Sequence, residues 1–463
     1  MSKVAPVALS TPASRMLTSY GRKLPRRQVS PGLVFVVLTM GLLLVRVNAQ
    51  DAEVEPSPIP ATSIDQPATT APEPELPSPG PEPEVTINGQ PVSESVRRFR
   101  YHFGVTVRTV YDDNINLTTV NRSGDFYTSF EPLVRLSLGE SGTESKNILE
   151  LIYAPNIILF WNHSDADAVQ HIIHLEAQRV FGKISATFSQ DIQLLDSADL
   201  RSLNDTTGRQ ANIDVGSRVR ENIYTTRLAA SYDLSSKTFL SGGVDYSRYD
   251  YATLISSEQI SGNLFLNYNY STKLVIGLGG TLGYNDTDGP TPAQHFEQVN
   301  LRANFNPGEK LSLSGSVGLE FRQFQGDVHG SYISPVFDLN ATYKPFDGTS
   351  MSLEGSRRTQ NSAVVAGGDY TNTNIHFAVQ QRFLQRIFVS LSAGYENAAY
   401  FSALNGMDLN RNDDYYYLQV AIDLNITRYW DIGLYYLRRA DSSSAQAFSF
   451  SDDQFGVRTS LMF

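Results

Sequence analysis

Residues 455–463 read FGVRTSLMF and alternate apolar and polar side chains up to the last residue of the chain. Successive side chains of a strand point to opposite sides, so one face of this segment is apolar. The apolar face consists of Phe455, Val457, Leu461 and Phe463. Only Thr459 interrupts the row on that face. This period-two pattern predicts a terminal β-strand with one apolar face.

The same alternation recurs through residues 97–463, in segments of about a dozen residues. Such strands are longer than the usual five or six residues and suit a tilted crossing of a membrane. Eight short polar turns and nine longer loops give seventeen connections, which join eighteen strands. An even count with both chain ends at the short turns is typical of outer-membrane barrels. The sequence therefore predicts an all-β fold, a transmembrane antiparallel up-and-down β-barrel of about 18 strands.

Residues 1–49 have the pattern of a secretory signal peptide. The first fifty residues contain seven basic side chains and no acidic one, and an apolar run precedes small residues at Ala49. We predict cleavage after Ala49. A membrane anchor is the alternative, although about 14 apolar residues are short for a bilayer span. Translation begins at Met1 or at Met16, and the sequence leaves both starts open.

Residues 50–96 are predicted to be a disordered periplasmic linker. Eleven of the 22 prolines and eight acidic residues lie within 51–91, without any Lys, Arg or His. Such a segment cannot bury enough apolar surface to fold. It is read as a passive linker, with a docking arm as the alternative. The chain's net charge of −11 argues against nucleic acid as a partner.

The composition supports a barrel in the outer membrane of a Gram-negative-type bacterium. No other segment is apolar over 18 residues, and a membrane protein without such helices must form a closed barrel. There are 24 Tyr and 24 Phe, many at strand ends, where aromatic girdles meet the lipid headgroups. No cysteine is present to form a disulfide. The expected partners are outer-membrane lipid and the barrel-insertion machinery, which would read the terminal strand.

If the apolar row faces lipid, the alternate row faces the lumen. Eighteen strands leave room for an aqueous channel. Acidic residues slightly outnumber basic ones in that row, which predicts a weak cation preference; alternatively, the charges pair across strands and stiffen the wall. The pore-lining candidates are Arg100, Arg108, Glu131, Arg135, Glu150, Asp191, Arg227, Asp245, Arg302, Glu320, Arg322, Asp338, Glu354, Arg358, Glu396, Asp423 and Arg458.

The longest loop, residues 195–219, is the third of the longer loops. Third loops commonly fold into the lumen of general porins, and an external lid is the equally weighted alternative. The candidates for a constriction are Asp199, Arg201, Asp205, Arg209 and Asp214.

Catalytic and metal-binding patterns are not found. His171 and His174 are three residues apart, which places them on opposite faces of a strand and prevents a shared metal. No phosphate-binding glycine pattern lies between a strand and a helix. The sequence therefore predicts no enzyme, no cofactor and no metal site.

The first predicted hairpin resembles a known family. Residues 110–115 read VYDDNI, residues 124–126 read GDF, and residues 130–136 read FEPLVRL. This pattern resembles the outer-membrane barrels called the β-barrel porin 2 family, which is similar to proteins encoded with exopolysaccharide systems. Glu131-Pro132 stands where family members often have Pro-Gly. The resemblance implies an outer-membrane barrel, with polysaccharide export as one role. Residues 112–114 are read as turn-forming, with cation or carbohydrate binding as the alternative.

The leading hypothesis is a porin for small hydrophilic solutes. The alternatives are a conduit for an exported exopolysaccharide and a non-conducting structural or adhesive barrel. A homo-oligomer is left open, because rows that face lipid and rows that face a second protomer look alike in one sequence.

Overall fold

The computed structural model describes residues 86–87, 90–91, 99–139, 147–197, 199–200, 210–289, 291–325, 331–402, 404 and 409–463. The predicted signal peptide and most of the predicted linker lie outside these residues. Within the linker, β1 (Thr86–Ile87) pairs antiparallel with β2 (Gln90–Pro91), a small hairpin that the sequence did not predict. Among the described residues, no helix is both long enough and apolar enough to span a membrane.

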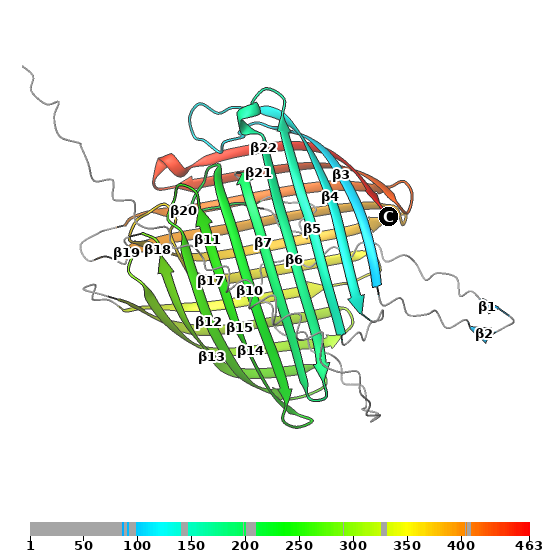
Figure 1. The fold of residues 1–463 in the computed structure, drawn as a ribbon, viewed down its shortest axis with the longest axis vertical. Coiled ribbons are helices and arrows are strands. Elements are labelled where there is room, and N and C mark those ends of the chain that lie inside the picture. The colour runs from blue at the N-terminus through cyan, green and yellow to red at the C-terminus, as the bar shows by residue number, and fades with distance from the viewer. Residues whose placement is uncertain are drawn as a thin grey trace, which may run out of the picture. The chain divides into compact units, whose positions relative to one another are not determined.

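Eighteen antiparallel strands close into a barrel, which confirms the predicted fold and strand number. Figure 1 shows consecutive strands side by side around the wall, and β22 meets β3 where the ring closes. The strands are β3 (Phe99–Asp112), β4 (Asp125–Gly139), β5 (Asn147–Phe160), β6 (Ala168–Phe181), β7 (Ile184–Ser197), β10 (Val219–Asp233), β11 (Thr238–Tyr251), β12 (Ser257–Asn269), β13 (Leu274–Thr287), β14 (Gln294–Gly308), β15 (Leu311–Phe324), β16 (Ser331–Tyr343), β17 (Thr349–Asn361), β18 (Gly368–Phe383), β19 (Ile387–Ser402), β20 (Asn412–Asn425), β21 (Trp430–Ser443) and β22 (Phe450–Met462).

Short elements lie in the longer connections. β8 (Asp199–Leu200) pairs with β9 (Gln210–Ala211) between β7 and β10. Single 3-10 turns form at η1 (Ser164–Ala166) and η2 (Gln446–Phe448). We call the barrel end with these longer connections the loop end and the opposite end the turn end.

The two faces of the wall differ in chemistry, as the alternation predicts. Leu264, Leu278 and Leu282 are 57–66% exposed, whereas Asn267 and Asn285, on the alternate row, are at most 5% exposed. The inner face of a closed barrel is shielded by the surrounding wall, so the row that is buried and polar along β12 and β13 faces the lumen. The exposed apolar row is the surface that lipid covers in transmembrane barrels.

Aromatic rings gather at both ends of the outer face. At the loop end the rings of Tyr111, Phe126 and Trp161 form a continuous row, with centroids 5.0 and 5.2 Å apart. At the turn end Tyr429 stacks near Phe463, 6.4 Å between centroids. Aromatic side chains at these two heights suit the headgroup zones of a bilayer.

The terminal residue completes the barrel. The main-chain N–H of Phe463 donates to the carbonyl of Phe103 at 2.8 Å, and the N–H of Phe103 donates back at 3.1 Å. Phe455 and Phe463 are 57% and 68% exposed on the outer face. The row predicted as the insertion signal therefore faces outward, and its recognition by the insertion machinery stays a prediction.

The assignment of faces can be tested with a neighbouring pair on β12. Leu264→Arg should destabilise the barrel by about 2–4 kcal/mol, because the charge would lie in hydrocarbon. Asn263→Arg is the matched control, since Asn263 lies on the inner row within 3.4 Å of an Asp245 oxygen. Denaturant unfolding of the barrel refolded in lipid vesicles measures both. Equal losses for the two variants would contradict the assignment.

Candidate functional site: the lumen and its loop end

Charged side chains on the inner face form ion pairs, most of them between neighbouring strands; Arg322–Glu320 lies within β15, and Arg458–Asp423 spans β21. Register places all seventeen pore-lining candidates on the lumen-facing row. Five ion pairs join them, at 2.7–3.9 Å: Arg108–Glu131, Arg135–Glu150, Arg227–Asp245, Arg322–Glu320 and Arg458–Asp423. Such pairs are the contacts expected of a wall stiffened by its own charges. That the same residues line an open pore stays a prediction.

Several other candidates bind neutral or imidazole partners. Glu354 accepts a hydrogen bond from Asn340 at 3.3 Å, and Glu396 accepts one from Asn372 at 2.6 Å. The remaining contacts are Asp191 with His174 at 2.7 Å, Arg302 with Asn267 at 2.9 Å and Arg358 with Ser356 at 3.2 Å. Arg100 and Asp338 lie on the same row.

Part of the longest loop crosses the loop end of the lumen. We call residues 212–216 the strap. Ile213 is 3% exposed and packs in a cluster with residues of β18, β19, β20 and β22 and with Leu117 of the first loop. β19 stands nine positions from β10 in the ring of eighteen, so the strap reaches the opposite wall. Of the other constriction candidates, Asp199 lies in β8, and Arg201, Asp205 and Arg209 lie outside the described residues.

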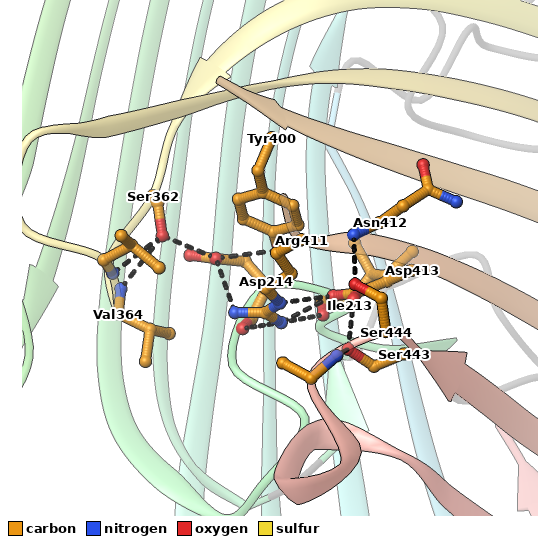
Figure 2. Close-up of polar contacts among 12 residues, drawn as sticks. Ile213, Asp214, Ser362, Val364, Tyr400, Arg411, Asn412, Asp413, Ser443 and Ser444 are labelled. Carbon is orange, nitrogen blue, oxygen red and sulfur yellow. Dashed lines mark hydrogen bonds and ion pairs between the residues drawn. The ribbon is translucent and has the colours of Figure 1, made fainter. Parts of the chain in front are cut away.

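Asp214 fixes the strap to the far wall, as Figure 2 shows. Its carboxylate accepts hydrogen bonds from the Ser362 hydroxyl at 2.7 Å and the Ala363 N–H at 2.6 Å. The Tyr400 hydroxyl donates a third at 3.0 Å. Because only 2% of Asp214 is exposed, this residue acts as an anchor and does not present its charge to an open lumen.

Arg411 supplies the compensating charge. One guanidinium nitrogen lies 3.8 Å from an Asp214 carboxylate oxygen, and another donates to the Asp214 carbonyl at 2.9 Å. A second ion pair joins Arg411 to Asp413 at 2.6 Å. The guanidinium also lies over the rings of Tyr400 and Phe448, 4.3 and 3.6 Å from the centroids. Sequence reasoning missed Arg411, because no local pattern connects it to a residue almost 200 positions earlier.

The protonation of Asp214 links the docking of the strap to pH. Burial raises the pKa of the Asp214 carboxyl, and the hydrogen bonds from Ser362 and Ala363 and the charge of Arg411 offset only part of this. The docked strap therefore binds a proton more tightly than a released strap would. By linkage, docking is favoured at low pH and weakens as pH rises through the raised pKa.

Residues 112–114, which belong to the pattern of the family resemblance, lie at the seam where β3 pairs with β22. Asn114 is fully buried, and its amide nitrogen donates to the carbonyls of Thr118 and Ser451, both at 2.9 Å. The Asp113 carboxylate accepts from the N–H of Asp453 at 2.8 Å, and Asp112 accepts from Gln454 at 3.0 Å. These bonds join the first loop to the last strand. Within the loop, the Asn114 N–H donates to the Asp112 carboxylate at 2.8 Å, a contact typical of turn-forming Asp and Asn residues.

Asp452 joins Asp112 and Asp113 in one carboxylate group, with ligand atoms within 4.8 Å of one another. Arg439 pairs with Asp452 at 2.7 Å, and Arg122 pairs with Asp113 at 2.9 Å. These arginines compensate much of the charge that would attract a cation, so the geometry favours a structural network.

Strap docking can be followed through single cysteines in this cysteine-free chain. Val215 is buried and Ser217 is exposed, so the ratio of Val215→Cys to Ser217→Cys modification rates cancels the thiol's own ionisation. We expect this ratio to rise with pH above the ordinary carboxyl value of 3.8, because the docked strap then loses its proton. Asp214→Asn should flatten the dependence. An unchanged slope in Asp214→Asn would show that another group controls docking.

Comparison with known proteins yields only distant similarity. No protein-family model matches the chain, and no curated protein matches it. The chain is similar to the crystal structure of Pseudomonas aeruginosa OpdK with vanillate (11% identity, TM-score 0.39), over 78% of this chain and 99% of that one. It is similar to P. aeruginosa OccK2 (OpdF) at 9% identity and TM-score 0.42, over 78% and 98%. It is also similar to Acinetobacter baumannii OccAB4 at 10% identity and TM-score 0.40, over 79% and 98%. At these values the similarity carries no argument about family or function.

Proposed function

We propose that this protein is an outer-membrane channel for small hydrophilic solutes, whose loop end is narrowed by the strap. The observation that carries the proposal is the polar inner row of a closed 18-stranded wall. A ring of that size is wider than side chains alone need for packing. A lumen lined with paired charges suits water and hydrophilic solutes, and the strap would set the size of what passes.

We further propose a weak cation preference. Arg322 and Arg458 each hold an acidic partner on the wall, so their charge is largely balanced. Glu354 and Glu396 instead accept hydrogen bonds from neutral amides. Arg302 and Arg358 also contact neutral partners, so the preference rests on the count: nine of the seventeen pore-lining candidates are acidic and eight are basic. This small excess of negative charge would attract cations. A reversal potential of the anion-selective sign would exclude this preference.

Single-channel recording in planar bilayers tests the channel and the strap together. Arg411→Ala removes the ion-pair partner of the buried Asp214 carboxylate. Leaving that charge buried without its partner is costly, so the strap should dissociate from the far wall and the conductance should rise. Arg428→Ala is the matched control, because Arg428 lies in a turn-end connection against Tyr429. Its conductance should equal that of the unmodified chain.

Other outcomes would support the alternatives. A barrel that folds, as judged by heat-modifiable mobility, but never conducts would favour a structural or adhesive role. An exopolysaccharide conduit would depend on residues 50–96 in cells, because those residues would meet periplasmic partners. A passive porin should work without them.

A further inference from the structure

The ladder between β16 and β17 stops halfway along the wall. It runs from Tyr343↔Met351 to Phe337↔Arg357 and ends there. Residues 331–336 of β16 and 358–361 of β17 are strand residues, yet they do not pair with each other. The flanking ladders, β15–β16 and β17–β18, continue to the strand ends at the loop end. The wall is therefore split between β16 and β17 in its loop-end half.

Pro335 explains where the ladder ends. It lies two residues beyond Phe337, the last paired residue of β16, and it has no N–H to donate. Proline within sheets is confined to edges and irregular positions for this reason. The partner of Pro335 on β15 is Leu319, which is 48% exposed on the outer face. At this level of the barrel wall the outer face is apolar, and unpaired main-chain N–H and C=O groups on a strand edge are costly in lipid. A proline at that edge has no N–H, so one fewer donor is left without a partner.

The loop-end part of the β17–β18 hairpin stays paired with β19, from Asn372↔Ala398 to Gly368↔Ser402, but lies on the lumen side of β16. We call residues 358–372 the hairpin tip. Ser362 and Ala363 bind Asp214 of the strap. The N–H of Ile255 donates to the carbonyl of Ala363 at 2.9 Å, and the N–H of Gly367 donates to Thr291 at 3.0 Å. The tip thus contacts three loops that begin elsewhere in the ring.

The hairpin tip lies beneath the strands before it. Asp369 and Thr371 alternate with the lumen-facing Tyr370 and belong to the outer row, yet they are at most 1% exposed. Inner-row side chains cover them. Gln294 of β14 donates to Asp369 at 2.7 Å, and the Tyr332 hydroxyl of β16 lies 3.0 Å from the Thr371 hydroxyl. β14 to β16 therefore overlap the tip from outside.

A polar chain crosses this overlap. Glu320 pairs with Arg322 at 2.9 Å, and Arg322 donates to Gln294 at 2.6 Å. Gln294 in turn donates to Asp369, which also accepts from Asn361 at 2.9 Å. Hydrogen bonds of this chain can be exchanged for bonds to water at small net cost, whereas the apolar contacts of Tyr370 with the cluster around Ile213 would have to be broken.

We propose that the hairpin tip is a gate with two binding positions, which we call seats. In the inner seat the tip lies inside the lumen, as observed, and in the second seat it pairs with the open edge of β16. The edge fits the tip because both belong to strands already in register below the split. If the register of the pair Phe337↔Arg357 is continued toward the loop end, Ser334 lies opposite Gln360. In the second seat the tip would leave the strap and widen the loop end, and the end of β19 would move with it, because residues 368–372 pair with residues 398–402. Pro335 would weaken that seat, which keeps the exchange reversible.

The proposal deepens the regulation of the proposed channel, and only its conductance readout rests on channel activity. Cross-linking tests the movement itself. The double variant Ser334→Cys/Gln360→Cys should form a disulfide only when the tip reaches the edge of β16. Asn340→Cys/Glu354→Cys is the positive control, because these residues already oppose each other. Mild oxidant is added to the folded barrel in detergent, and the disulfide is read as a mobility shift.

A second substitution tests whether the contacts of the inner seat set the rate of disulfide formation. Gln294→Leu removes the bond to Asp369 and should speed formation of the Ser334–Gln360 disulfide by about tenfold, because a buried hydrogen bond to a charged group is lost. Gln259→Leu is the matched control. It makes the same change on the inner row of β12, where Gln259 accepts from Asn285 and lies outside the polar chain. It should leave the rate unchanged.

The outcomes separate the gate from the channel. No disulfide where the control pair oxidises fully, or equal rates in Gln294→Leu and Gln259→Leu, would overturn the gate. Disulfide formation in a barrel that never conducts would support the movement of the tip and contradict the proposed channel. Disulfide formation with a rise in conductance that reductant reverses would support both.

Discussion

Pairing of main-chain hydrogen-bonding groups is the constraint on which the rest of this structure depends. In lipid every N–H and C=O needs a partner within the protein, and a sheet meets that need only by closing on itself. Closure gives the chain an inner face that lipid cannot reach, and it is there that charged residues are buried. Where pairing fails, between β16 and β17, the local sequence carries a proline and the neighbouring hairpin turns inward.

Local patterns predicted the wall well. Alternation is a property of neighbouring residues, so strand positions, the eighteen-strand count and the two faces could be read from the chain. Turns and loops carried equally local signals. The small hairpin of β1 and β2 had none, because two-residue strands are too short to show a period.

The arrangement at the loop end could not be predicted from the sequence. Asp214 was a candidate for a constriction, but its partners Ser362, Tyr400 and Arg411 lie 148 to 197 residues away. Pro335 was visible in the sequence, yet it could not show that the next hairpin would fold beneath β14. Such contacts depend on curvature around the whole ring, which no window of the sequence contains. At the loop end some of the pore-lining candidates, such as Glu320 and Arg322, are buried in polar contacts, and whether the row lines an open pore stays a prediction.

The seam between first and last strands has a consequence for folding kinetics. β3 is the first strand of the barrel and its partner β22 is the last, so the Thr106 hydroxyl bonds the Ser460 hydroxyl across 354 residues. Contacts of such separation form slowly, because the entropy of ordering the intervening chain is lost before they are gained. The free edge of β3 must therefore persist until the final strand arrives. An exposed edge is a template for pairing with other chains. The barrel is thus most prone to aggregation just before its last residues dock.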